Sequence, residues 1–244
     1  MVQSMKLAFN IVDWQASAPG LSEHDAWQAW GKTAAIIDVS SPLTKSRHLP
    51  MMTARRLASG SRLAVDCALA ILSRQNVDAL VFASRHGELE RNFRILTALA
   101  GRESLSPTDF AMSVHNSAVG NTTIAAQQAL VSSSVSAGFD SFSQALIEVV
   151  ALHHSGYQRV MLVDFDGLIP EFYHSHLPDE AVSLPFAVAV LLEAGSQIQC
   201  ETTPNQTTGA RGLPQGLAFL HGWLSGEPTF TLIGERLCWC WSRH

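Results

Sequence analysis

Residues Phe110–Val150 read FAMSVHNSAVGNTTIAAQQALVSSSVSAGFDSFSQALIEVV, and they combine a loop, two helix patterns and a strand pattern. The first apolar pattern carries Ile124 and Ala125 at helical spacing and predicts an amphipathic helix. Leu130–Val135 then alternates apolar and small polar residues, as a strand does, and Phe142–Val150 returns to a helical period. The sequence therefore predicts a helix, a strand and a second helix in direct succession.

The turn between this strand and the second helix reads Ser136-Ala137-Gly138-Phe139-Asp140-Ser141. Many α/β enzymes hold a nucleophile in such a turn. The reason is that the free N–H groups and the positive dipole end of the helix N-terminus stabilise negative charge on an attacking sulfur or oxygen. No cysteine stands in this turn. We therefore expect this turn to have the local structure that holds a nucleophile in such enzymes, but no thiol that could act as the nucleophile.

The order and spacing of three pieces resemble the N-terminal half of β-ketoacyl synthases, the condensing enzymes of fatty acid and polyketide synthesis. These pieces are SVHNSAVG at residues 113–120, VSSSVSAG at residues 131–138 and ALIEVVAL at residues 145–152. The paired arginines of Met51–Leu57 are also similar to the start of the corresponding synthase helix. The resemblance covers about residues 5–195.

This resemblance implies half of a thiolase-like α/β fold, with a mixed, mainly parallel five-stranded sheet and helices on both faces. It places a ketosynthase N-terminal-like domain at residues 5–195 and leaves residues 196–244 as a C-terminal extension of unknown role. It also places the family's nucleophile at Phe139, so the chain is similar to a synthase without its nucleophile. Malonyl-using synthases draw two catalytic histidines from a C-terminal half, which we expect this chain to lack.

Subunits without the nucleophile are known in the family as chain-length factors, and the short single-half forms of aryl polyene clusters look closest. The resemblance thus implies a non-catalytic subunit that pairs with an active ketosynthase, shapes its acyl tunnel and meets acyl carrier protein through the complex. It implies no catalytic residue, cofactor or metal. It places the tunnel at Phe110, Met112, His115 and Phe139. It places the dimer interface, paired antiparallel with the partner, at Leu130, Val131, Ser132, Ser133, Ser134 and Val135.

A small independent hydrolase or phosphatase stays open as an alternative. Asp164-Phe165-Asp166-Gly167 follows a predicted strand, and two such carboxylates can serve as nucleophile and general acid around Mg²⁺. Ser141 is a second candidate nucleophile, although no GxSxG turn surrounds it. His153-His154 point apart at a helix end, and His174-x-His176 lies in a loop without an acidic ligand at fixed spacing. We expect no metal site from either pair.

The composition limits the class of protein. Charged residues make up 15% against roughly 25% in an average soluble domain, and hydrophobic residues reach 47%, which favours an oligomer. The net charge of −5 argues against nucleic-acid binding, which depends on Lys and Arg at phosphates. The longest apolar run, Leu184–Leu192, is too short to cross a bilayer, and Met1–Leu7 has no cleavable apolar core. We expect a cytoplasmic protein without a membrane span.

Periodicity also predicts elements outside the central stretch. The predicted strands are Lys6–Trp14, Ala35–Val39, Val77–Ala83, Arg159–Val163, Val182–Leu192, Thr229–Ile233 and Leu237–Trp241. The predicted helices are one capped by Ser22 and ending at Trp30, the long Thr53–Ser73, and Gly87–Ala100. Gln197–Gly216 is rich in Thr, Gly, Pro and Gln, which is typical of a linker.

Overall fold

A computed structural model describes residues 4–177, 183–206 and 212–244 of the chain. The strands are β1 (Lys6–Ser17), β2 (Ala79–Ala83), β3 (Val131–Val135), β4 (Arg159–Asp166), β5 (Phe186–Ala194), β6 (Ile198–Pro204), β7 (Thr229–Ile233) and β8 (Leu237–Arg243). The helices are α1 (His24–Trp30), α2 (Met51–Ala54), α3 (Ser59–Leu72), α4 (Leu89–Ala100), α5 (Pro107–Ala111), α6 (Ser117–Ala126), α7 (Ser141–His154) and α8 (Gln215–Ser225). Two short 3-10 segments are η1 (Gly138–Asp140) and η2 (Glu171–His176).

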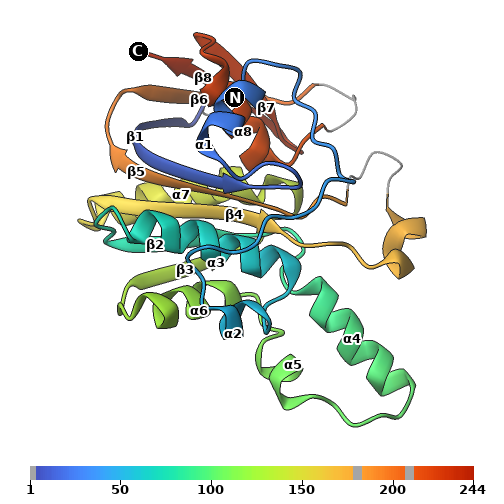
Figure 1. Ribbon diagram of the computed structural model, residues 1–244. Coiled ribbons are helices and arrows are strands. Elements are labelled where there is room, and N and C mark those ends of the chain that lie inside the picture. Colours follow the sequence, from blue (N-terminus) through green and yellow to red (C-terminus); the bar gives the residue numbers. More distant parts are fainter. Residues whose placement is uncertain (1–3, 178–182, 207–211) are drawn as a thin grey trace.

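All strands of the described part join one eight-stranded sheet in the order β3-β2-β4-β5-β1-β6-β8-β7 (Figure 1). β2 pairs parallel to both β3 and β4, whereas β4 with β5 and β5 with β1 pair antiparallel. Four of the first five strands in this order therefore run in the same direction, which confirms the predicted mixed, mainly parallel core. The predicted count of five strands is wrong, because β6, β8 and β7 extend the core by antiparallel pairing.

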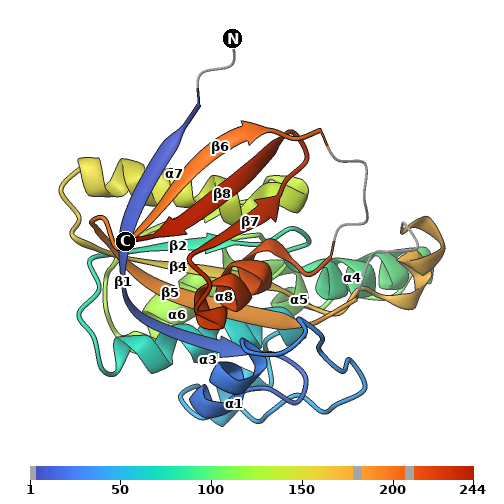
Figure 2. The same ribbon diagram turned by 90° about the horizontal axis from the view of Figure 1, so that it is seen from above.

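The three added strands bend away from the core through β1. Lys6–Phe9 of β1 pairs with β6, whereas Phe9–Ser17 pairs with β5, with a register shift between Ile11 and Asp13. Figure 2 shows β1 as the curved strand shared by both parts. Residues after 195 continue the same sheet, so the sheet has no break at the predicted domain boundary. The division of the chain into two domains at that residue stays a prediction.

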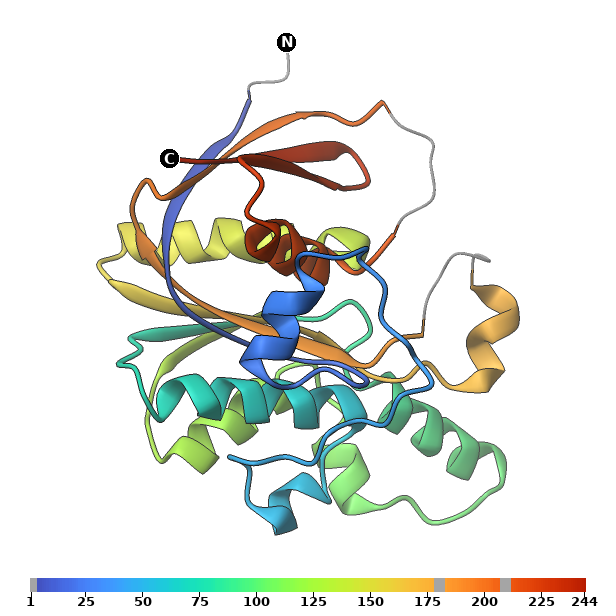
Figure 3. The same cartoon turned by 45° about the horizontal axis from the view of Figure 1, so that its top comes forward.

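Helices cover both faces of the sheet, as predicted (Figure 3). Alternate residues of β2 divide between two apolar layers, with Leu80 and Phe82 on one face and Ala79 and Val81 on the other. α3 and α6 pack on the first face, and α7 and α8 pack on the second. Burial on both faces explains why the central strands read as nearly continuous apolar runs.

The long helix predicted over Thr53–Ser73 is interrupted between α2 and α3. The carbonyl of Arg56 in this break accepts a hydrogen bond of 2.5 Å from the Arg91 guanidinium. Gly60 lies against the backbone that follows β4, where a Cβ would meet the carbonyl carbon of Asp166 at 2.5 Å. Tertiary contacts therefore override the helical pattern at this point.

Other boundaries differ from the sequence prediction. Ala35–Val39 forms no strand, and Ile36 is 74% exposed, so this segment lacks both a pairing partner and a buried face. The predicted linker, residues 197–216, contains β6 and the start of α8, and its residues 207–211 lie outside the described part. Of the predicted strand 182–192, residue 182 lies outside the described part, and β5 begins at Phe186. Glu23, not Ser22, is the N-cap of α1.

Candidate functional site

β3 forms one edge of the sheet, and β2 is its only strand neighbour in the described part of the chain. Val131 and Ser132 are exposed, and the other three residues of the strand are half-buried. Val131 pairs with Ala79 in register, and its side chain is 46% exposed. The segment predicted as the dimer interface, with Leu130 directly before β3, therefore lies where a further strand could add. Its contact with a partner stays a prediction.

A hollow of about 480 Å³ lies beside β3. It is lined by His115, Asn116, Val119, Ser132, Ser134 and Ser136. Ser132 and Ser134 pair in register with Leu80 and Phe82, so they point to the face of the sheet that α3 and α6 cover. The Oγ of Ser134 is buried without a hydrogen-bond partner. Small hydroxyl side chains thus leave space where larger apolar side chains would fill the layer.

His115 is held at the carboxyl end of β2. Its Nε2 lies 3.1 Å from the Ser84 carbonyl oxygen, and a Cβ on Gly87 would come within 3.0 Å of its ring. Gly87 has a φ of 54°, a conformation that glycine adopts readily. The hydroxyl of Ser84 in turn donates to Asp166 Oδ1 at 2.7 Å. His115 therefore has a fixed, hydrogen-bonded place beside the hollow.

The turn at Phe139 is the predicted junction between strand and helix. Phe139 lies in η1, between β3 and α7, and Gly138 before it has a φ of 58°. The Ser141 hydroxyl donates to the Gly138 carbonyl at 2.7 Å and accepts from the Ala137 N–H at 3.0 Å. Ser141 is only 3% exposed. Its hydroxyl closes the turn and is not presented to a substrate in this structure.

The cysteines of the chain lie away from this turn. Cys67 is in α3 and Cys200 is in β6, and both are buried. Burial raises the pKa of the Cys200 thiol to about 12. Cys238 and Cys240 are half-buried on β8. None of these thiols stands at the position where the resemblance places the nucleophile.

The predicted tunnel residues separate into two groups. Phe110 lies in α5 with 67% of its surface exposed, whereas Met112 is partly buried against the layer of α3 and α6. His115 lines the hollow, but Phe110, Met112 and Phe139 do not. Phe110 is therefore the most exposed of the four tunnel candidates.

The carboxylates of the alternative hypothesis are both held by the chain. Asp164 is 5% exposed, and its Oδ2 accepts from the Gly216 N–H at the start of α8 at 3.2 Å. Asp166 accepts from the Ser84 hydroxyl and, at 2.8 Å, from the His86 N–H. Burial, reinforced by the charge of Asp166, raises the pKa of Asp164 well above its usual range. These contacts give both carboxylates structural roles.

No cluster of metal-ligating side chains occurs among the described residues. One histidine of each pair considered from the sequence has a ring nitrogen close to a backbone carbonyl oxygen. His153 Nε2 lies 3.3 Å from the Leu192 oxygen, and His174 Nε2 lies 2.9 Å from the Ile169 oxygen. Within residues 4–177, 183–206 and 212–244, no helix has both the length and the apolar character needed to cross a membrane.

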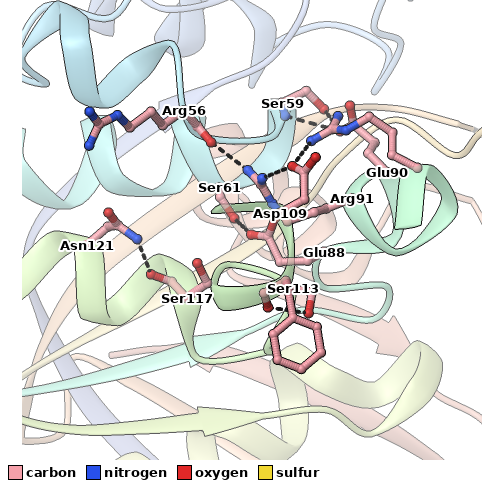
Figure 4. Close-up of polar contacts among 12 residues, drawn as sticks. Arg56, Ser59, Ser61, Glu88, Glu90, Arg91, Asp109, Ser113, Ser117 and Asn121 are labelled. Atoms are coloured by element: carbon pink, nitrogen blue, oxygen red, sulfur yellow. Dashed lines mark hydrogen bonds and ion pairs between the residues drawn. The ribbon is translucent and has the colours of Figure 1, made fainter. Parts of the chain in front are cut away.

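A network of charged side chains around Arg91 was not predicted from the sequence (Figure 4). Arg91 in α4 is 2% exposed and forms ion pairs with Glu88 at 3.3 Å and with Asp109 in α5 at 2.5 Å. The only local signal is the Glu88/Arg91 spacing of three residues, which is typical of a helix surface. The contact with Asp109 joins residues far apart in sequence and leaves no local pattern.

The sheet order and the strand–turn–helix at its edge define a thiolase-like α/β fold of the ketosynthase type. The chain belongs to the β-ketoacyl synthase family, because the model of the beta-ketoacyl synthase N-terminal domain matches residues 27–242. A chain in the solved complex of the ketosynthase ApeO with its chain length factor ApeC from Xenorhabdus doucetiae is 57% identical. That match covers 97% of this chain and 100% of the other, with a TM-score of 0.94.

Two more distant solved structures share the fold. The ishigamide ketosynthase/chain length factor is 17% identical, with a TM-score of 0.64 over 82% of this chain and 68% of the other. A beta-ketoacyl synthase from Burkholderia phymatum STM815 is 12% identical, with a TM-score of 0.55 over 92% of this chain and 71% of the other. A comparison with curated proteins finds no significant match. The family model and the 57% identical chain confirm the resemblance to β-ketoacyl synthases that was stated from the sequence.

Proposed function

We propose that this chain is a non-catalytic chain-length-factor subunit that pairs with an active ketosynthase and shapes its acyl tunnel in polyketide synthesis, such as that of aryl polyenes. The observation that carries this proposal is the turn Ser136–Ser141, which has the expected place between β3 and α7 but contains no thiol. Condensation proceeds through an acyl chain carried on a nucleophile. The 57% identity to a chain of a ketosynthase–chain length factor complex supports the same assignment.

The partner surface in this proposal is the edge strand β3. Its five residues include no charge and no proline, and such an edge is an aggregation liability unless another chain covers it. Three apolar side chains in the segment that precedes β3 in the sequence are also exposed: Phe110 by 67%, Val114 by 51% and Ile124 by 76%. Antiparallel pairing of β3 with the corresponding strand of the ketosynthase would cover the edge and continue the sheet. We propose that Leu130 and Val131–Val135 make this contact.

The length-limiting residue in this proposal is Phe110. Its exposed ring is free to enter the neighbouring subunit, while Met112, His115 and Phe139 line the tunnel closer to their own chain. Forcing an additional chain extension against a filled tunnel end costs about 1–3 kcal/mol of overpacking. This cost favours the shorter product by roughly one to two orders of magnitude. Small replacements at Phe110 or Met112 should therefore lengthen the product and leave the complex intact.

The chemistry in this proposal stays with the partner. Acyl carrier protein would deliver thioesters to the ketosynthase within the complex, which we place in the cytoplasm, and this subunit would need no cofactor. It would act through shape alone.

Coexpression with the ketosynthase partner, followed by mass spectrometry, tests the proposal. We expect the two chains to copurify and, after incubation with an acyl carrier protein thioester, the added acyl mass to appear on the ketosynthase only. An acyl group on the present chain, or condensation by this chain alone, contradicts the assignment. Ester or phosphate ester hydrolysis by the purified chain, lost in Ser141→Ala or Asp164→Asn, would establish the alternative.

A further inference from the structure

The segment that carries Phe110 has little packing of its own. α4 projects from the body of the molecule, and α5 folds back beside it (Figure 1). Every residue from Gly101 to Ala111 is exposed except Asp109. Apolar burial therefore cannot fix the position of α5, and Asp109 is the one side chain of this segment that turns toward the protein.

Asp109 is anchored by Arg91, a guanidinium that is almost completely buried. Arg91 Nη1 lies 2.5 Å from Asp109 Oδ1, and Arg91 Nε lies 3.3 Å from Glu88 Oε2 (Figure 4). Arg91 and Glu88 are each 2% exposed, and Asp109 is 25% exposed. A buried charge is costly unless it is paired, so removal of one member leaves the others uncompensated. This cost opposes any movement of Asp109 away from Arg91.

Arg91 also ties α5 to the sheet-packed part of the chain. Its Nη2 donates to the Arg56 carbonyl at 2.5 Å, in the break before α3. Glu88 accepts a hydrogen bond from the hydroxyl of Ser61, which lies inside α3. One guanidinium therefore joins α5 to α4 and to the start of α3, the helix that packs on the sheet.

From these contacts we propose that Arg91 is the positioning residue of Phe110. By holding Asp109, the neighbour of Phe110, it sets how deeply the Phe110 ring stands in the partner's tunnel and so sharpens the upper limit of acyl length. This inference rests on the proposed function. A lysine cannot replace Arg91, because a single ammonium lacks the planar fork that reaches Asp109 and the Arg56 carbonyl together.

Arg94 supplies a matched control. It contacts the same oxygen, Asp109 Oδ1, at 3.1 Å, but its side chain is 51% exposed, and among the described residues it forms no hydrogen bond or ion pair with α3. Exposed ion pairs of this kind contribute little. Arg94→Lys keeps a charge near Asp109 and leaves the buried network in place.

The test measures product lengths from the reconstituted heterodimer by mass spectrometry for Arg91→Lys, Arg94→Lys, Phe110→Ala and the double variant Arg91→Lys/Phe110→Ala. We expect Arg91→Lys to raise the share of over-length product about 3- to 10-fold and Arg94→Lys to change it less than about 2-fold. The double variant should match Phe110→Ala, because a ring that is absent cannot be mispositioned. Copurification with the ketosynthase should persist in all variants.

The outcomes separate this inference from the proposed function. If Phe110→Ala shifts product length but Arg91→Lys does not, or if the two effects add in the double variant, the positioning role is overturned and the proposed function stands. If Phe110→Ala itself leaves product length unchanged, both are overturned. Should Arg91→Lys fail to fold, Asp109→Asn takes its place, since it removes the same ion pair from the partly exposed side.

Discussion

The two edge strands of the sheet, β3 and β7, are equal in length and differ in what covers their side chains. Both strands have five residues without charge or proline, VSSSV in β3 and TFTLI in β7. β7 turns Phe230 and Leu232 inward, where α8 lies beneath the bent sheet and Phe219 stands 5.8 Å from Phe230 between ring centroids (Figure 3). β3 instead turns Ser132 and Ser134 into an open hollow.

Under the proposed function, β7 completes its own chain, whereas β3 is left for the partner subunit. Large apolar side chains on β7 fill the space against α8, so this edge contributes to the stability of the fold. The serines of β3 leave a hollow of about 480 Å³ beside the strand, and Val131 on the same strand is 46% exposed. Changes at β3 should therefore act on assembly, and changes at β7 should act on folding.

The largest effect is expected from a charge at Val131, the first residue of the proposed assembly edge. Val131→Lys should weaken the heterodimer at least about 100-fold, because the ammonium would have to lose its water in an apolar interface. The fold should tolerate the change, since Val131 is 46% exposed in the single chain. Isothermal titration against the ketosynthase measures the affinity, and thermal melting of the single chain measures the fold.

Thr231→Lys on β7 is the matched control for this charge. Thr231 is an exposed residue in the middle of the other edge strand. We expect its variant to bind the ketosynthase with wild-type affinity. Loss of binding in Thr231→Lys together with normal binding in Val131→Lys would place the interface at β7 and contradict the proposed interface at β3.

The second effect concerns stability at the β7 edge. Gly222→Ala should lower the free energy of unfolding by about 1–3 kcal/mol, because the new Cβ would clash with the Phe230 ring between α8 and β7. Urea denaturation of the single chain checks this value. Gly120→Ala in α6 is the control, since a Cβ there meets nothing within 4 Å and the variant should be as stable as wild type or more so.

Gly222→Ala should also leave the affinity of the folded chain for the ketosynthase unchanged. An affinity that falls with this variant, measured at a temperature where it is fully folded, would show that the β7 edge takes part in assembly.

The central stretch could be predicted from sequence because its signals are local. β3 and α7 begin within one or two residues of the predicted strand and helix, since alternation and helical period are complete within each element. The family resemblance rests on the same residues, and it also gave the mixed sheet core. Local periodicity was thus sufficient for the part of the chain that forms the β3 edge.

The β7 side was harder to predict, because its strands depend on distant partners. β6 buries Ile198, Cys200 and Thr202 in alternation, but its threonines and glutamine make it similar to a linker. Its strand character comes from pairing with β1 on one side and β8 on the other. The Arg91 network was missed for a related reason: its charge pattern is like that of a helix surface, and its contacts with Arg56, Ser61 and Asp109 join segments that are distant in sequence.

The last effect depends on pH and tests how α8, the helix beneath the β7 edge, is anchored to the core. Asp164 on β4 is buried and accepts from the Gly216 N–H of α8. Burial raises its pKa well above the usual range, so the folded protein binds this proton more tightly than the unfolded chain does. Stability from this group is complete below the unfolded pKa of about 3.9 and is lost as pH rises toward the folded pKa.

Asp164→Asn should remove this loss, because an amide keeps an acceptor oxygen for Gly216 without carrying charge. Wild type should lose up to about 1.4 kcal/mol of stability per pH unit in that window relative to the variant, a difference that denaturation curves at several pH values would show. The exposed Asp25→Asn on α1 should instead follow the wild-type pH dependence. If Asp164→Asn is less stable than wild type by the same amount at every pH, the carboxylate contributes a hydrogen bond that the amide cannot reproduce. The anchoring of α8 would then not depend on a proton.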